Sequence, residues 1–130
     1  MPFSISTDQI ARTEDSLGAS LPERYRASMA RSNGGDVEAR EDHWQLHPLE
    51  DKSDLKRVSR TASHIVRETE QARLWPNFPP DAISIASNAA GDLLVLRRRD
   101  GTIHDTVYIW SHEDGKLTEL AKSIEELRSA

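Results

Sequence analysis

The sequence predicts a single α+β domain built around a mostly antiparallel sheet. Helical patterns lie near both ends and in the middle of the chain, and several strand patterns follow one another closely after residue 80. Turn signals such as Asp100-Gly101 and Asp114-Gly115 separate these strands. Strands joined by tight turns pair antiparallel, whereas parallel strands need long crossovers. We therefore expect a sheet of about four to six strands with two N-terminal helices, one long middle helix and a C-terminal helix.

Two helices are expected before residue 35. The first begins at a capping box, in which Ser6 caps the helix and Gln9 reaches back to it. It ends at Gly18, which suits the left-handed position after a helix. The second begins at Pro22, because the missing N–H of proline costs nothing in a first turn. It ends at Asn33-Gly34-Gly35, since these residues tolerate positive φ.

A strand is expected over His43–Leu49, because its polar and apolar residues alternate. Trp44 and Leu46 share one face, and the polar residues, including both histidines, share the other face toward solvent. His43 and His47 would then lie about 13 Å apart, too far to share one metal ion. We expect no metal site here.

The clearest helical pattern covers Ser53–Ala72. Its apolar residues, Leu55 and Val58 among them, fall within an arc of about 120° at helical spacing, which predicts one continuous amphipathic helix. The preceding residues 36–42 are polar and are expected to form a loop. Further strands are expected over residues 82–87, 92–98 and 106–110, with a short one near 117–120. A last helix opens at Ser123.

Composition limits the classes of function. The 130 residues suit one domain, residues 1–130, and the absence of cysteine removes disulfides, thiolate metal sites and cysteine nucleophiles. No apolar run approaches the roughly 20 residues of a membrane span, and the N-terminal residues do not read as a signal peptide, so we expect a cytoplasmic protein. The net charge of −5 argues against nonspecific nucleic-acid binding.

The charge distribution gives the sharpest functional signal. Seven acidic and only two basic residues lie between Asp36 and Asp54. Such a block is either an ordinary charged loop or a surface that steers a basic partner, and the sequence leaves both readings open. The three tryptophans are expected to pack in the core, and Trp44, beside this block, is the one that could instead be an exposed interface anchor. The partner-binding hypothesis covers Asp36, Glu38, Glu41, Asp42, Trp44, Glu50 and Asp51.

No motif indicates catalysis or a cofactor. The chain has no nucleophile elbow, phosphate-cradling loop or helical zinc-protease pattern, so we expect no enzyme. Two basic groups, Lys56/Arg60/Arg67 and Arg97-Arg98-Arg99, could follow a nucleic-acid backbone. A wet helix face and a solvated strand end are the favoured interpretations, and nucleic-acid binding is the less favoured alternative.

Short motifs recur along most of the chain, and they include Leu21-Pro22 with Tyr25, Asn33-Gly34-Gly35, Trp44-Gln45-Leu46, Gly91-Asp92 and Val107-Tyr108 with Trp110. In their order and spacing these motifs resemble the SUKH superfamily, which includes the fungal Smi/Knr cell-wall regulators and many bacterial immunity proteins. Two features depart from the family pattern: Ala89-Ala90 in the turn before Gly91-Asp92, and the segment 53–75. The residues that identify the fold are Pro22, Asn33, Gly34, Gly35, Gly91, Asp92 and Trp110.

The resemblance implies a non-enzymatic α+β domain that binds another protein. Bacterial relatives typically neutralise a toxin, often a nuclease or deaminase, so a cognate toxin is the expected partner. A regulatory or scaffold domain with a housekeeping partner, as in the fungal relatives, is the alternative. An acidic inhibitor suits a nucleic-acid-degrading toxin, because it can occupy a positive substrate channel as a phosphate mimic.

Overall fold

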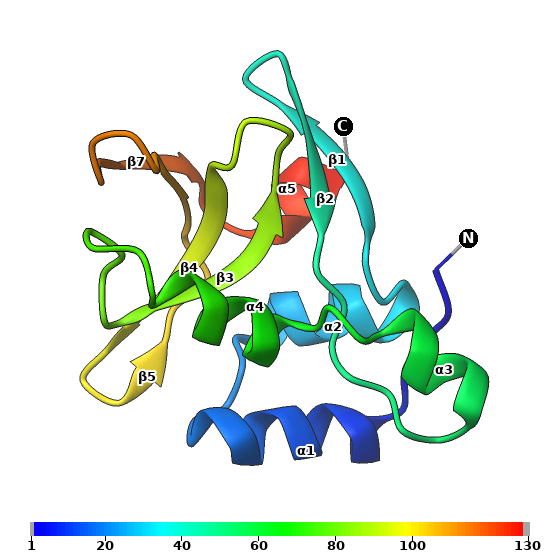
Figure 1. The fold of residues 1–130 in the computed structure, drawn as a ribbon. Coiled ribbons are helices and arrows are strands. Elements are labelled where there is room, and N and C mark those ends of the chain that lie inside the picture. Colours follow the sequence, from blue (N-terminus) through cyan, green and yellow to red (C-terminus); the bar gives the residue numbers. More distant parts are fainter. Residues whose placement is uncertain (1, 129–130) are drawn as a thin grey trace.

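A computed structural model describes residues 2–128, which form a curled antiparallel sheet with helices around it (Figure 1). The strand order is β1-β2-β3-β4-β6-β7, and β5 pairs with β4. The strands are β1 (Gly35–Ala39), β2 (Asp42–Leu46), β3 (Ala82–Ser87), β4 (Leu93–Arg99), β5 (Thr102–Ile103), β6 (Val107–Trp110) and β7 (Leu117–Ala121). The helices are α1 (Thr7–Leu17), α2 (Glu23–Arg31), α3 (Leu55–Arg60), α4 (Ile65–Ala72) and α5 (Ile124–Arg128). The α+β class and the antiparallel sheet predicted from the sequence are confirmed.

The first helix begins and ends as its sequence predicts, and the second, Glu23–Arg31, lies just inside its predicted bounds. The Ser6 hydroxyl accepts a hydrogen bond from the Gln9 N–H, and Gly18 ends α1 with a left-handed φ of 71°. Pro22 is the N-cap of α2 and is buried. After α2, positive φ occurs at Gly34 (111°) and Gly35 (94°), where a side chain would be strained.

Asn33 has a different role from the two glycines that follow it. Its buried amide donates to the Leu49 carbonyl at 2.8 Å and accepts from the Leu49 N–H at 2.7 Å. Its backbone N–H donates to the Phe3 carbonyl at 2.8 Å. One residue therefore joins the end of α2 to two segments that are distant in sequence.

The segment expected to be a loop, residues 36–42, is mostly strand. Asp36 and Glu38 lie within β1, which pairs with β2 in a hairpin whose register places Val37 opposite Trp44. The sequence did not predict this strand, because Val37 is its one large apolar residue and the turn that follows lacks glycine and asparagine.

The expected long middle helix is present as two helices, α3 and α4, separated by residues 61–64. The Thr61 hydroxyl donates to the Arg57 carbonyl and accepts from the Asp51 N–H, which anchors the chain where α3 ends. The imidazole of His64 then caps α4 by accepting from the Arg67 N–H. The helix axis is broken here, and Ile65 and Ala72 of α4 are buried while Leu55 and Val58 of α3 are exposed.

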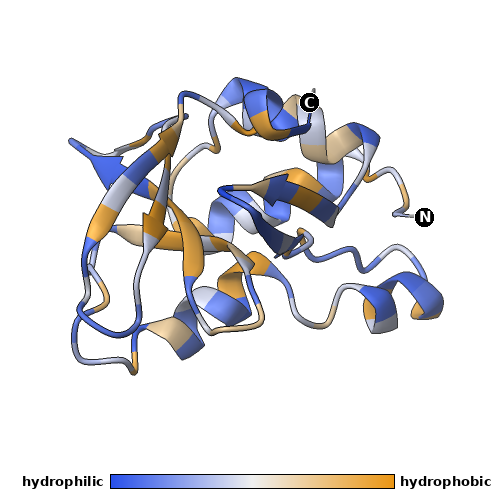
Figure 2. Ribbon diagram, turned by 90° about the horizontal axis from the view of Figure 1, so that it is seen from above, coloured by the Kyte–Doolittle hydropathy of each residue, from blue (hydrophilic) through white to orange (hydrophobic). Residues whose placement is uncertain are grey.

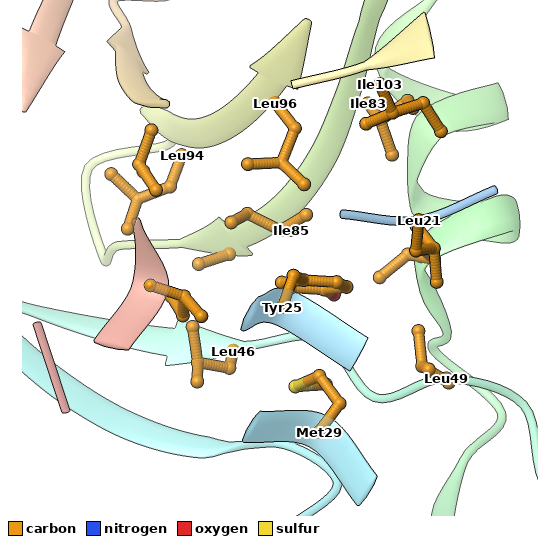
Figure 3. Close-up of a cluster of buried hydrophobic side chains, with 14 of the residues drawn as sticks. Leu21, Tyr25, Met29, Leu46, Leu49, Ile83, Ile85, Leu94, Leu96 and Ile103 are labelled. Atoms are coloured by element: carbon orange, nitrogen blue, oxygen red, sulfur yellow. The ribbon is translucent and has the colours of Figure 1, made fainter. Parts of the chain in front are cut away.

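The main core fills the space between α2 and the sheet. Tyr25 and Met29 of α2 face Ile85, Leu94 and Leu96 of the central strands (Figure 3). Burying a side chain of this size contributes roughly 1.5–3 kcal/mol. Figure 2 shows hydrophobic residues concentrated on the strands inside the molecule. Helix α4 packs on β3, and α5 packs against α2 and β1.

A smaller aromatic cluster lies on the face of the central strands opposite the main core, because Val95 and Trp110 alternate with main-core residues along β4 and β6. Trp110 is buried, its ring lies 5.3 Å from that of Phe78, and its indole N–H donates to the Asn77 carbonyl. Half-exposed Trp75 lies edge-on to Trp110 at 6.3 Å. Trp110, which the sequence analysis gives as a residue that identifies the fold, is therefore a core residue of this cluster.

The Gly91-Asp92 turn joins β3 to β4. Gly91 has a φ of 97°, and the Asn88 side chain accepts from the N–H groups of Ala90 and Asp92. The Asp92 carboxylate accepts from both the backbone N–H and the ring Nδ1 of His112. Burial alone would raise the pKa of Asp92, but the hydrogen bonds from His112 hold it below its usual value.

His47 corrects a second expectation, because it is buried rather than solvent-facing. It lies just beyond the end of β2, and its Nε2 lies 3.2 Å from the Ser84 hydroxyl on β3. Burial lowers the pKa of His47 to about 4, because the charged imidazolium would lose its hydration.

The buried neutral imidazole of His47 predicts acid sensitivity. Between the ordinary histidine pKa of about 6.5 and the folded value of about 4, the unfolded chain binds more protons, so stability falls as pH falls. We expect His47 to contribute a loss of about 3 kcal/mol in the free energy of unfolding across this interval. Urea denaturation at several pH values measures it. His47→Gln should flatten the dependence, whereas His104→Gln, at an exposed histidine, should leave it steep; equal slopes in both variants would contradict the prediction.

Candidate protein-binding surface

The β1–β2 hairpin carries an exposed acidic face. Antiparallel register places Glu38 opposite His43 and Asp36 opposite Gln45, on the face that points away from Trp44. The side chains of Asp36, Glu38 and His43 are 58%, 74% and 60% exposed. We call Asp36, Glu38, Glu41, His43 and Gln45 the acidic hairpin face.

The hairpin turn is tight and strained. Arg40 and Glu41 have φ values of 55° and 61°, which is the backbone of a type I′ turn. Such turns favour asparagine and glycine, because other residues lose about 1–2 kcal/mol in the left-handed region. The Arg40 guanidinium donates to the Glu119 carbonyl of β7 at 3.3 Å, so the tip of one edge hairpin reaches the opposite edge strand. Glu41 remains exposed at the tip.

His43 lies between two carboxylates. Its Nδ1 is 2.7 Å from Glu38 and its Nε2 is 3.3 Å from Asp36. The hydrogen bond with Glu38 raises the pKa of His43, and the charge of Asp36 acts in the same direction. The net negative charge of this face therefore increases as pH rises and His43 loses its proton.

Asp42 has a structural position within the hairpin. One carboxylate oxygen accepts from the His43 N–H at 2.9 Å, and the other accepts from the Asn88 amide at 2.7 Å. These bonds tie the hairpin tip to the turn between β3 and β4. Asp42 is half-buried and is less available to a partner than Glu41.

Trp44 is buried, as core packing predicts, and it is not the exposed interface anchor of the partner-binding hypothesis. It is 2% exposed, on the inner face of β2, and its indole N–H donates to the Ala39 carbonyl at 3.2 Å. A period-two strand places a large apolar residue on the face opposite its polar neighbours, and here that face is the core. The Trp44 side chain therefore packs in the core on the opposite side of the hairpin from the acidic residues.

Glu50 and Asp51 lie apart from the hairpin, in the segment before α3, where basic groups compensate them. Glu50 lies 3.9 Å from Lys52 and 3.5 Å from His64. Asp51 is 2% exposed and pairs with Arg57 at 3.0 Å. Burial alone would raise the pKa of Asp51, but hydrogen bonds from Ser53 and Arg57 hold it below its ordinary value. The acidic block of the sequence thus divides into an exposed hairpin part and a paired loop part.

A groove of about 870 Å³ lies beside β1. It runs between β1, the end of α2 and the C-terminal α5, with Val37 and Leu127 among its apolar residues and Asp36 and Glu38 among its acids. Arg128 lies in the groove but donates to Ser28 and to the Gly34 carbonyl. Sequence reasoning missed this groove, because its walls come from segments that only the fold brings together.

The basic groups of the alternative nucleic-acid interpretation are dispersed and partly engaged. Arg97 pairs with Asp81 at 2.9 Å, and β4 lies inside the sheet rather than at an edge. The cations of Lys56 and Arg60, on α3, lie over the ring of Phe3 in the N-terminal segment. Among residues 2–128, histidine and carboxylate side chains form no group of three able to hold a metal ion.

The fold and this surface define a small α+β domain that presents charged surfaces and a groove. The SMI1 / KNR4 family (SUKH-1) matches residues 4–129, so the chain belongs to this family. Its members are generally non-catalytic immunity or regulatory domains, and membership supports a protein-interaction or immunity-type domain with a protein partner. A search of curated proteins finds no match. Within residues 2–128, no helix has the length and apolar character needed to cross a bilayer.

The contacts of His43 predict that its pKa depends more on Glu38 than on Asp36. We expect its imidazole to titrate above 6.5, and Glu38→Gln to lower that pKa more than Asp36→Asn does. The interaction with the carboxylates is fully present below pH 6.5 and is lost as pH rises through the raised pKa. NMR titration of the imidazole resonances measures this. Equal effects of the two substitutions would contradict a dominant hydrogen bond to Glu38.

The strained turn predicts a stabilising substitution. Replacing Arg40-Glu41 with Asn-Gly should raise the free energy of unfolding by about 1 kcal/mol, because both residues tolerate positive φ. Thermal and urea denaturation measure the change. The matched control replaces both residues with alanine, which removes the same charges but keeps a Cβ at each strained position. If the alanine control is stabilised as much, charge rather than backbone strain is responsible.

Proposed function

We propose that this domain is an immunity protein that binds and neutralises a cognate bacterial toxin of the nuclease or deaminase type. The observation that carries the proposal is the acidic hairpin face, which projects three carboxylates into solvent from one rigid element. Membership of the SMI1/KNR4 family supports a protein as the partner.

The hairpin suits a basic partner for physical reasons. Enzymes that act on nucleic acids bind phosphates with lysine and arginine, so their substrate channels are positive. Asp36, Glu38 and Glu41 would present negative charges to such a channel and exclude the substrate. Complementary charge of this kind accelerates association and disfavours wrong partners.

Backbone pairing makes the hairpin a suitable support for these charges. Asp36 and Glu38 stand two residues apart on a paired strand, and Trp44 fixes the opposite face. Carboxylates held in this way lose less conformational freedom on binding than those of a flexible loop. An inhibitor that neutralises the toxin by occupying its channel needs no catalytic group of its own. We propose that the protein acts in the cytoplasm.

Co-expression with the product of the neighbouring gene tests the proposal. We expect rescue from toxicity and a complex that weakens as salt increases. Glu38→Lys with Glu41→Lys should reduce affinity by about tenfold or more, mainly through slower association. The matched control is Glu70→Lys with Glu113→Lys, which makes the same charge change at exposed acids on α4 and in the β6–β7 connection.

The outcomes separate the parts of the proposal. If the neighbouring product is harmless and the partner is a housekeeping protein, the immunity function is wrong. If toxin binding persists with unchanged affinity and salt dependence after the hairpin reversal, the hairpin is not the binding surface.

A further inference from the structure

Strand β1 is an edge strand whose outer side borders the groove. It pairs with β2, and on its other side no strand lies next to it within residues 2–128. Figure 1 shows β1 at the margin of the sheet, with α5 beside it. The free edge of a strand presents N–H and carbonyl groups to which another extended segment can bind.

The hairpin register shows which residues of β1 turn these backbone groups outward. Because the turn has two residues, Ala39 and Asp42 form a hydrogen-bonded pair, and such pairs alternate with non-bonded pairs along an antiparallel ladder. Val37 is therefore bonded to β2, whereas the N–H and carbonyl groups of Asp36 and Glu38 point away from β2. These backbone groups face the free edge.

The pairing of β2 with β3 supports this assignment independently. The N–H of His47, just after β2, donates to the Ile85 carbonyl of β3 at 2.8 Å. Alternate residues of β2 before His47 therefore also bond to β3, and the residues between them, Trp44 included, bond to β1. Since Trp44 lies opposite Val37, the ladder again leaves the two acidic residues of β1 facing outward.

The groove provides room for an extended segment along this edge. It has a volume of about 870 Å³ and is lined by β1 on one side and by α5 on the other. The groove is crowded near Gly35, because a Cβ there would lie 3.2 Å from Pro2 and 3.7 Å from the Arg128 guanidinium. Within residues 2–128, no loop or side chain hydrogen-bonds to the outward backbone groups of Asp36 and Glu38. The accessible edge therefore runs from Asp36 toward the hairpin tip.

We propose that an extended segment of the partner protein, with basic residues at alternate positions, adds to the free edge of β1 as a further strand. Its backbone bonds to Asp36 and Glu38, as in other complexes formed by strand addition. Its basic side chains lie on the acidic hairpin face, because side chains at matching positions of neighbouring strands share a face. The intervening side chains point to the opposite face, on the side of Leu127.

The acidic residues of β1 decide which kind of strand is accepted. A second copy of β1 would bring its own Asp36 and Glu38 beside those of the first, and like charges in neighbouring strands are destabilising. Lysine or arginine at the same positions is attracted instead. The two carboxylates therefore protect the edge against self-association and leave it open to a basic strand.

Strand addition deepens the proposed function, and it rests on the hairpin as the surface that meets the partner. It adds main-chain hydrogen bonds to the charge attraction, and it specifies an extended basic segment as the part of the partner that binds. Rescue from toxicity and binding of a peptide are separate measurements, so either part can fail alone.

A synthetic heptapeptide in which lysine alternates with valine is the probe. Hydrogen exchange of the chain, followed by NMR at low salt, measures its effect. In the free chain we expect rapid exchange at the amides of Asp36 and Glu38, because no hydrogen bond protects them. The peptide should slow both amides by about tenfold or more. The amide of Val37, already paired with β2, is the internal control and should change little.

Two N-methylated peptides separate backbone pairing from charge attraction. One carries methyl groups on the lysine amides and the other on the valine amides, and both keep every charge. Because alternate residues of a strand face the same neighbour, one of the two should lose binding and the other should retain it. The peptide that loses binding also identifies the direction of the added strand.

Glu38→Pro tests the same contact from the side of the chain. Proline removes the outward N–H and leaves the bonds to β2 in place, because an edge strand tolerates proline where its N–H faces away from the sheet. The matched control, Glu38→Gln, removes the same charge but keeps the N–H. We expect Glu38→Pro to raise the Kd of the heptapeptide by about tenfold over Glu38→Gln. Circular dichroism confirms that both variants are folded.

Three results would overturn strand addition. These are a heptapeptide that does not bind at low salt, equal binding of the two N-methylated peptides, and equal affinities for folded Glu38→Pro and Glu38→Gln. If toxin rescue occurs but the peptide does not slow exchange at Asp36 and Glu38, the immunity function stands and strand addition is wrong. If the peptide adds as expected and the neighbouring gene product is harmless, strand addition stands and the immunity function is wrong.

Discussion

The buried side chain of Asn33 holds together the junction from which the acidic hairpin begins. Its amide satisfies both the N–H and the carbonyl of Leu49, and its own N–H donates to Phe3. Losing one partner of a buried hydrogen bond costs about 1–3 kcal/mol, and here two backbone groups depend on one amide. The residue holds together the N-terminal segment, the end of α2 and the chain leaving β2. Gly34 and Gly35 then turn the chain directly into β1.

Two segments continue from this junction, one into the acidic hairpin and one toward α3. After Gly35 the hairpin carries the acidic residues, and after Leu49 the chain reaches Asp51, whose carboxylate receives Arg57 and thereby fixes α3. The N-terminal segment, held by Asn33, supplies the Phe3 ring on which the cations of α3 rest. The acidic and basic features are therefore close together because one buried amide organises both connections.

The sequence predicts local features well and surfaces poorly. The Ser6 cap, the stop at Gly18 and the antiparallel strands after residue 80 are set by neighbouring residues, and they are confirmed. The Gln9 side chain, expected to complete a capping box, instead accepts from the Lys52 N–H. The exposure of Trp44 is not local: alternation correctly separates it from His43, but only the fold decides which face is covered. The helical period of residues 53–72 likewise could not reveal the break near Thr61, because that break depends on Asp51 from another segment.

The division of the acidic block shows why charge counts alone do not locate a binding surface. Glu50 and Asp51 resemble Asp36 and Glu38 in sequence, yet basic side chains accompany them in the fold. Asp51 is buried and must keep its partner Arg57, because separating them would leave a buried charge without compensation. The hairpin carboxylates stay exposed, with His43 as a titratable counter-charge, and can exchange water for a partner's cations. The folded structure therefore distinguishes the exposed carboxylates that we propose for partner binding from the charges that hold the chain together.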